Sequence, residues 1–252
     1  MARRAITVAA AMLAVFVIAV TALAVAASRS AAQPVVLGPV IESSPAAPRA
    51  AATDQPPAPG AVRTATDPLQ AWAQQQAQRT AIPVAAVRAY GRAELRLRAE
   101  QPGCRLGWVT LAGIGEVESD HGRYQGRTLG DQGISSTPIV GVALDGVGVA
   151  RIGDTDGGML DGDPALDRAV GPMQMLPSTW RRWAADGDGD GVREPQDIDD
   201  AALAAARYLC ASGSLRSDEG WRAAVLSYNA SSAYLVNVAA WAGAYAGASS
   251  RR

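Results

Sequence analysis

The chain has 252 residues, of which 48% are apolar and 19% are charged, and its formal net charge is −1. A chain of this length and composition is long enough to bury one sizeable hydrophobic core. It contains no lysine, and its near-neutral balance shows no basic stripe. These features argue against nucleic acid as a partner.

The first 32 residues predict a membrane-targeting segment. Arg3 and Arg4 precede an uncharged, mostly apolar run from Ala5 to Ser28. This run is longer than the usual apolar region of a signal peptide and could cross a bilayer, which needs about 20 residues. Small residues at 22–32 also offer cleavage sites. We therefore expect residues 1–32 to be either a signal-anchor transmembrane helix, which the length favours, or a signal peptide. In both cases the remainder is extracytoplasmic.

Residues 33–68 are rich in Pro, Ala, Ser and Thr and predict a disordered linker, because they hold too few large apolar side chains to fold. We expect the folded domain at residues 69–246. The chain has two cysteines, Cys104 and Cys210. In an exported chain such a pair favours one disulfide, with two buried free thiols as the alternative. The bridge would contribute roughly 2–4 kcal/mol to stability.

Helical patterns dominate the predicted domain, so its fold class is mainly α. Residues 131–167 are rich in Gly, Asp and β-branched residues and predict loops with at most a short hairpin. The predicted helices are Ile82–Arg98, Leu106–His121, Pro177–Ala185, Asp199–Cys210, Gly220–Asn229 and Ala233–Ala244.

Glu118 is the candidate catalytic residue. It extends an apolar stripe with helical spacing that is formed by Trp108, Leu111, Ala112 and Gly115. Poor solvation there would raise the pKa of its carboxyl, as a general acid requires. Glu116 lies about 200° around the helix and is expected to face solvent. The alternative for Glu118 is a buried ion pair with Arg123 or Arg127. His121 is the one histidine, and we expect it at the helix end, near the helix dipole.

An acidic loop follows, with the spacing of an EF-hand calcium loop. Read as twelve positions, it places carboxylates at 1, 3, 5, 9 and 12, a glycine at 6 and a backbone carbonyl at 7. The corresponding residues are Asp186, Asp188, Asp190, Glu194, Asp197, Gly191 and Val192. We predict a structural Ca²⁺ held by Asp186, Asp188, Asp190, Asp197 and the Val192 carbonyl. The alternative is a solvated acidic loop without a metal.

Three further segments resemble motifs of lytic transglycosylases and goose-type lysozymes, in the order of that family. Glu118-Ser119-Asp120-His121-Gly122 has its Glu-Ser-x-x-Gly form, residues 171–178 resemble its Gly-x-x-Gln-x-x-Pro-Ser segment, and Ser227-Tyr228-Asn229 resembles its Tyr-Asn motif. With the acidic loop, the chain is most similar to the membrane-bound transglycosylase B group, where aspartate at position 12 is usual. The insertion at 154–163 is similar to one that actinobacterial members of this group often carry.

The resemblance implies a lysozyme-like domain that cleaves peptidoglycan. Glu118 would protonate the MurNAc–GlcNAc β-1,4 linkage and then accept the proton of the 6-hydroxyl, which leaves a 1,6-anhydro-MurNAc end. Gln174 and Tyr228 would line the substrate cleft, and Asn229 would bind the sugar or orient Glu118. For Gln174 a helix cap is the alternative, and for Tyr228 core packing. Trp180 and Trp183 are expected in the core rather than as sugar platforms.

The expected partners are peptidoglycan glycan strands and, through residues 1–32, the cytoplasmic membrane; we expect a monomer, anchored or secreted to the cell wall. Two other functions stay open. A muramidase would cleave the same bond with water and would share every motif. A non-catalytic wall-binding module would use the Ca²⁺ as a staple.

Overall fold

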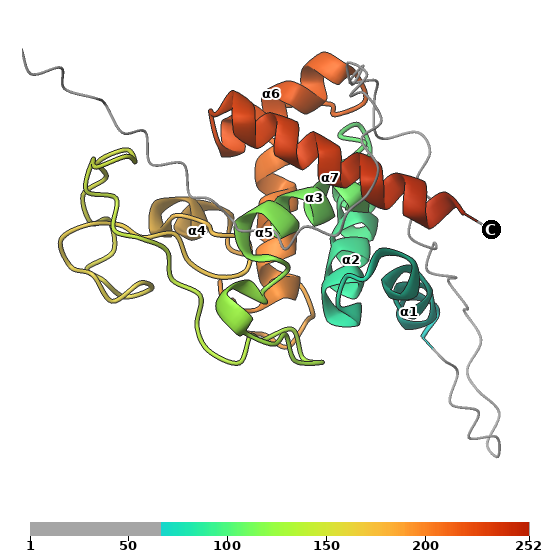
Figure 1. The fold of residues 1–252 in the computed structure, drawn as a ribbon, viewed down its shortest axis with the longest axis horizontal. Helices are drawn as coiled ribbons and strands as arrows, with labels where there is room; N and C mark the ends of the chain where they lie inside the picture. Colours follow the sequence, from blue (N-terminus) through green and yellow to red (C-terminus); the bar gives the residue numbers. More distant parts are fainter. Residues whose placement is uncertain (1–66, 252) are drawn as a thin grey trace, which may run out of the picture.

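A computed structural model describes residues 67–251 of the chain, and this part is mainly helical (Figure 1). The elements are α1 (Pro68–Thr80), α2 (Val84–Glu100), α3 (Trp108–Ser119), the short 3₁₀ helix η1 (Tyr124–Gly126), α4 (Pro177–Trp183), α5 (Ile198–Cys210), α6 (Asp218–Tyr228) and α7 (Ser232–Ser250). The predicted membrane segment and nearly all of the predicted linker lie outside the described residues. Among the helices of 67–251, none is long and apolar enough to cross a membrane.

The core is built around α5 and α3. Nearly all of α5 is buried, and its alanines let α2, α4 and α6 pack against it. In α3 every residue from Trp108 to Gly115 is buried, which is typical of a helix that is hydrophobic all round. α7 lies across α3, as the ribbon shows (Figure 1). The buried position of α3 places Glu118, near its carboxyl end, at the edge of the core.

The six helices predicted from the sequence are confirmed, with shifted ends, but α1 was not predicted. Its sequence is mostly Gln and Ala with little apolar periodicity, and of its residues only Ala73 and Gln76 are buried. Local signals mark its start: Pro68 opens the helix, and the Asp67 carboxylate accepts from the Leu69 N–H at 3.0 Å. The helix is held by packing, with the Trp72 ring edge-on to Trp108 of α3 at 5.4 Å between centroids.

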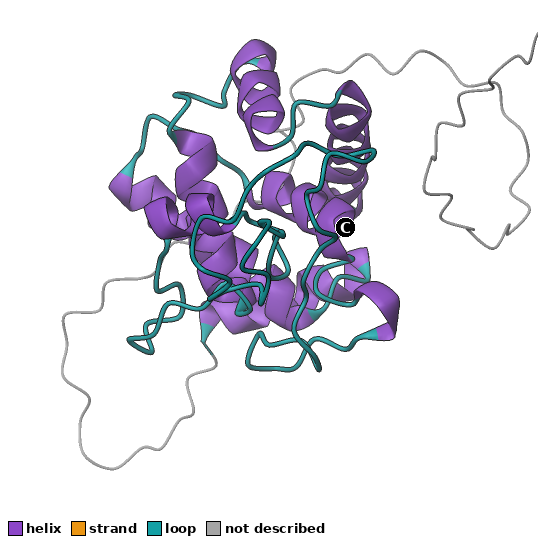
Figure 2. Ribbon diagram, turned by 90° about the vertical axis from the view of Figure 1, so that its left-hand side faces the viewer, coloured by secondary structure: helices purple, strands orange, loops and turns teal. Residues whose placement is uncertain are grey.

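Residues 131–167 form loops, as predicted; the loops extend over residues 127–176, and the described part of the chain contains no β-strand (Figure 2). Isolated antiparallel bridges, such as that between Asp145 and Arg151, take the place of the hairpin considered from the sequence. Aspartate side chains shape these loops by accepting backbone N–H groups. Asp154 accepts from Gly157 and Gly158, and Asp163 accepts from Ala165 and Leu166. The insertion is therefore ordered by local Asx bonds instead of a core of its own.

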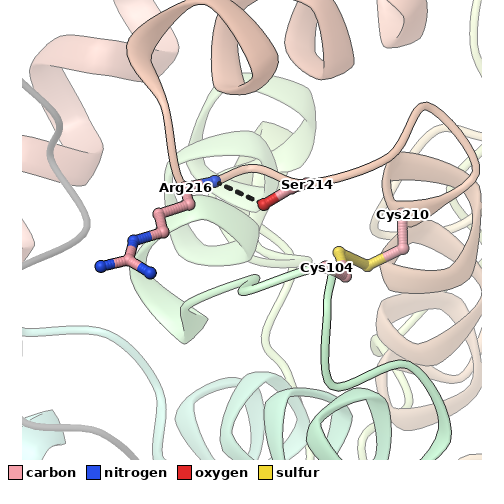
Figure 3. Close-up of a disulfide and its surroundings, with 4 residues drawn as sticks. All are labelled: Cys104, Cys210, Ser214 and Arg216. Carbon is pink, nitrogen blue, oxygen red and sulfur yellow. Dashed lines mark hydrogen bonds between the residues drawn. A yellow bond between two sulfur atoms is a disulfide. The ribbon is translucent and has the colours of Figure 1, made fainter.

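A disulfide joins Cys104 to Cys210, as predicted (Figure 3). It links the loop before α3 to the last residue of α5 across 106 residues of sequence. The Cys104 carbonyl also accepts from the Leu215 N–H at 2.7 Å. In the same turn, the Arg216 N–H bonds the Ser214 hydroxyl oxygen at 3.3 Å. The bridge thus fastens the connection between α5 and α6 to the base of α3.

Candidate active site

Glu118 lies in the last turn of α3 and is partly buried. The Tyr234 hydroxyl, from α7, donates to its Oε1 at 2.6 Å. Burial raises the pKa of Glu118 to about 7, although the tyrosine hydrogen bond acts in the opposite direction. The ion pair considered from the sequence is absent from the described residues, where Arg123 pairs with Asp120 instead at 2.5 Å. A carboxyl that titrates near neutral pH is suited to act first as an acid and then as a base.

Glu116 does not face solvent, so that prediction was wrong. Its Oε2 accepts from the Tyr245 hydroxyl at 2.6 Å and lies 2.9 Å from His121 Nε2. Burial alone would raise the pKa of Glu116, but these two hydrogen bonds outweigh it and leave the pKa below its usual range. The two carboxyls of α3 are therefore shifted in opposite directions. Glu116 is held as the anion, and Glu118 is the one that can carry a proton at neutral pH.

His121 follows α3, as expected, but it is fully buried and not placed as a charge against the helix dipole. Its Nδ1 lies 3.0 Å from the Tyr90 hydroxyl, and its Nε2 lies 3.0 Å from the Tyr245 hydroxyl. Burial, the largest cause, lowers the pKa of His121. A neutral ring gains little from a dipole, so hydrogen bonding is the main reason for its position.

The three motifs noted in the sequence meet in the structure through two backbone carbonyls. The Ser119 hydroxyl, next to Glu118, donates to the Pro172 carbonyl at 2.6 Å. The Tyr228 hydroxyl donates to the following carbonyl, that of Met173, at 2.7 Å. Burial, and then the charge of Glu118, raise the pKa of Tyr228. Tyr228 therefore has a defined polar contact beyond core packing.

Gln174 follows these two carbonyls directly, with a left-handed backbone (φ 46°). Its amide nitrogen donates to the Gly171 carbonyl at 3.0 Å, so it holds its own loop and does not cap a helix. It is partly exposed. Asn229 is exposed at the end of α6, where its side-chain oxygen accepts from the Ser231 N–H at 3.1 Å.

The sequence analysis missed Tyr234, which makes the direct bond to Glu118. Its hydroxyl belongs to a buried side chain on α7, six residues after Tyr228. The sequence did contain one indication of this role: Tyr234 is a tyrosine in a predicted helix that has no charged residues. The hydroxyl of a buried tyrosine requires a polar partner, and that partner must then come from another part of the chain. Of the tryptophans, Trp180 is in the core, as expected, and Trp183 is partly exposed with the Arg182 guanidinium over its ring.

The acidic loop brings together a carboxylate that was not in the predicted set. Oxygens of Asp186, Asp188 and Asp200 lie within 4.8 Å of one another. The carboxylate of Asp197, predicted at position 12, accepts from the Asp199 N–H at 2.7 Å and caps α5. Asp190 accepts from the Val192 N–H at 2.7 Å. Oxygen donors of this kind fit a hard cation such as Ca²⁺.

Asp200 is fixed in this position by its own hydrogen bonds. Its two oxygens accept from the Gly187 and Glu194 N–H groups at 2.6 and 2.7 Å. Burial, together with the charges of Asp188 and Asp186, raises the pKa of Asp200 to about 6. A second group of carboxylates, Asp154, Asp156 and Asp167, is equally close together in the preceding loops.

Comparison with known proteins finds similarity over part of this site. Residues 165–233 match the family model described as Transglycosylase SLT domain. The match covers the part of the chain from the loop before α4 to the start of α7. The matched segment contains Gln174, the acidic loop and Tyr228, whereas Glu118 and Tyr234 lie outside it. No curated protein matches the chain. Among solved structures, the Escherichia coli lytic transglycosylase Slt35 in complex with bulgecin A is similar, with 15% identity over 73% of this chain and 79% of that chain and a TM-score of 0.43.

Proposed function

We propose that the protein is a peptidoglycan lytic transglycosylase that cleaves the MurNAc–GlcNAc β-1,4 bond and leaves 1,6-anhydro-MurNAc ends during cell-wall remodelling. The observation that carries this proposal is Glu118, a carboxyl with a pKa of about 7 beside a tyrosine hydroxyl. Ser119 and Tyr228 hold the Gln174 loop next to it. The transglycosylase match over 165–233 supports the same activity.

In the proposed reaction Glu118 acts twice. As an acid it gives its proton to the glycosidic oxygen, so the bond to C1 of MurNAc breaks and the GlcNAc hydroxyl leaves. The acetamido group of the substrate stabilises the cationic centre at C1. The Glu118 carboxylate then removes the proton of the MurNAc 6-hydroxyl, whose oxygen bonds to C1. The acid is regenerated and no water is consumed.

A single carboxyl near the reacting bond supports this route over hydrolysis by a pair of carboxylates. Burial raises the pKa of Glu118, the Tyr234 hydrogen bond lowers it, and no charge of a second carboxylate contributes to the shift. The Glu116 carboxylate is hydrogen-bonded to His121 and Tyr245 instead. Glycosidases that use two carboxylates require a second one about 5–10 Å away.

Mass spectrometry of the fragments released from purified cell wall tests the proposal. We expect anhydro muropeptides, which are lighter by one water than fragments with reducing ends. A digest that contains only reducing ends would instead support the hydrolytic muramidase. Wall binding without any cleavage would support the non-catalytic module.

The pH dependence of the reaction provides a further prediction. Because Glu118 must start protonated, kcat/KM is expected to fall as the pH rises through about 7, the pKa of its carboxyl in the free protein. Tyr234→Phe removes a hydrogen bond that stabilises the carboxylate, so this descending limb should move to higher pH. Initial rates of release from soluble glycan strands between pH 5 and 9 would measure both. A limb at the same pH in the wild type and in Tyr234→Phe would contradict the assignment to Glu118.

We propose that the acidic loop holds a structural Ca²⁺ through Asp186, Asp188, Asp190 and the Val192 carbonyl. The sequence predicted Asp197 as the final ligand. We add Asp200 to the proposed ligands, because its carboxylate lies close to those of Asp186 and Asp188. The cation would join the loop after α4 to the first turn of α5. It would act on stability, because none of these residues bonds Glu118.

Chelation tests the calcium proposal. With Ca²⁺ at about 100 times its Kd, removal by EDTA should lower the Tm by about 5–10 °C. Asp186→Asn should abolish the calcium-dependent part of the Tm, whereas the exposed Asp131→Asn should keep it. Loss of the response in Asp154→Asn instead would assign the cation to the second carboxylate group. No response in wild-type protein shown to be metal-free would refute both assignments.

We also propose that residues 1–32 place the enzyme outside the cytoplasm, anchored to the membrane or secreted to the wall, where glycan strands are the substrate. The arginines at 3 and 4 and the apolar run after them support this. Sequencing the N-terminus of the mature protein from membrane and medium fractions would separate an anchor from a cleaved signal peptide.

A further inference from the structure

A polar network lies close to the proposed acid, and among the described residues no hydrogen bond joins the two. We call it the histidine network, and it consists of Tyr90, Glu116, His121 and Tyr245. The Glu116 carboxylate can only accept hydrogen bonds, so His121 Nε2 carries its hydrogen and Nδ1 accepts from the Tyr90 hydroxyl. With this tautomer, His121 Nε2 donates to the Glu116 carboxylate, and His121 Nδ1 accepts from Tyr90. The Glu116 carboxylate also accepts from Tyr245.

The backbone at the end of α3 depends on this network. Asp120 and His121 both have left-handed conformations, with φ of 50° and 54°. The His121 N–H closes the helix by donating to the Gly115 carbonyl at 2.9 Å. Two successive non-glycine residues adopt this conformation only where their surroundings hold them there. The fixed imidazole ring of His121 provides that restraint, three residues after Glu118.

Two tyrosines of α7 bond carboxyls on different sides of α3. Tyr234 bonds Glu118, and Tyr245 bonds Glu116. The tyrosines are 11 residues apart, so they share one face of α7 and are separated by about 16 Å along it. The two glutamates are two residues apart, which is about 200° around α3. A rotation of α3 about its axis would therefore disturb both bonds.

The helices approach so closely that this rotation is also restrained sterically. A Cβ atom at Gly113 would lie 2.8 Å from the carbonyl oxygen of Val238, which is on α7 between the two tyrosines. A Cβ at Gly115 would lie 2.0 Å from the Tyr90 hydroxyl. Both values are too short for real contacts. The two glycines let α7 and the network reach the backbone of α3.

We propose that the histidine network is a positioning device that sets the rotation of α3 against α7 and so holds the Glu118 carboxyl in its catalytic direction. This inference rests on the proposed function of Glu118. Tyr90, Glu116, His121 and Tyr245 are positioning residues, because they act through α3 and not on the substrate.

Tyr245→Phe removes one hydroxyl and little volume, so it tests the inference directly. We expect kcat on soluble glycan strands to fall about tenfold while KM stays within about twofold, since a small misplacement of a catalytic group costs rate more than binding. The descending limb of the pH profile of kcat/KM should also move to higher pH, as we expect for Tyr234→Phe. Thr110→Val is the matched control, because it deletes another buried hydroxyl of α3, one that accepts from Trp221. It should keep kcat and the pH limb even where its Tm falls.

The pKa of Glu118 can also be followed without substrate, by ¹³C NMR of the labelled carboxyl. We expect it to rise in Tyr245→Phe and to stay unchanged in Thr110→Val. If Tyr245→Phe does not fold at 25 °C, Glu116→Gln weakens the same bonds and should give the same shift. A pKa identical to that of the wild type in a folded variant overturns the inference. Wild-type protein that releases no fragments would overturn the proposed function instead, while the NMR titration would still decide the role of the network.

Discussion

Glu118→Gln is expected to reduce the release of anhydro muropeptides by about 10³-fold, with binding to purified cell wall retained. Glutamine has the shape of glutamic acid, and its oxygen can still accept from the Tyr234 hydroxyl, which is 2.6 Å from Glu118. It cannot give a proton to the glycosidic oxygen or take one from the 6-hydroxyl. The loss should therefore appear in kcat. Release assays and wall-binding assays on the same preparations would measure the two effects separately.

The same variant should be more stable than the wild type, but only at higher pH. Folding raises the pKa of Glu118 from 4.5 to about 7, so the wild type loses unfolding free energy as the pH rises between these values. Glutamine does not ionise. Above pH 7 we expect Glu118→Gln to gain on the order of 1–3 kcal/mol over the wild type, and below pH 4.5 to show no such gain. Urea unfolding at pH 4 and pH 8 would measure the difference.

Glu100→Gln is the control, since Glu100 bonds Arg207 and Arg96 at the surface and lies outside the site. It should keep its activity. Lytic activity retained by Glu118→Gln would remove Glu118 from the mechanism. A wild type that binds the wall but cleaves nothing would remove the mechanism itself and favour a wall-binding module.

Local patterns in the sequence were sufficient to predict most helices and the disulfide. Apolar periodicity with stop signals such as Gly122 located α3, and two cysteines in a chain expected to be exported allowed a single pairing. Glu118 was selected because it extends an apolar stripe. In the structure α3 is buried on all sides as far as Gly115, so the stripe does not by itself distinguish Glu118. Its raised pKa comes from burial at the carboxyl end of a central helix.

The remaining features depend on contacts between distant parts of the chain. The prediction for Glu116 failed because helical periodicity cannot show that α7 supplies Tyr245 to its other side. The bond of Tyr234 to Glu118 joins residues separated by 116 positions. Asp200 reaches the acidic loop from within α5, beyond the twelve positions of the pattern. Tertiary packing decides each of these, and a local pattern contains no information about it.

Removal of the disulfide in the double variant Cys104→Ala/Cys210→Ala is expected to lower the unfolding free energy by about 2–4 kcal/mol and the Tm by roughly 5–15 °C. The bridge closes 106 residues of sequence, so the unfolded chain gains much freedom when it is lost. Both cysteines are buried, and the Leu215 N–H bond to the Cys104 carbonyl remains in the variant. Urea unfolding of the oxidised wild type, the reduced wild type and the double variant would measure the loss, and the last two should agree.

Catalysis should survive this change at temperatures well below the new Tm. Cys104 precedes the amino end of α3, whereas Glu118 lies in its last turn, about 15 Å further along the helix. The hydrogen bond that holds Glu118 comes from Tyr234 of α7, not from the segment that the disulfide fastens. We therefore expect kcat at 25 °C within about twofold of the wild type, since a uniform loss of stability leaves the folded population almost complete. A tenfold loss of kcat in folded double variant would show instead that the position of Glu118 depends on the base of α3.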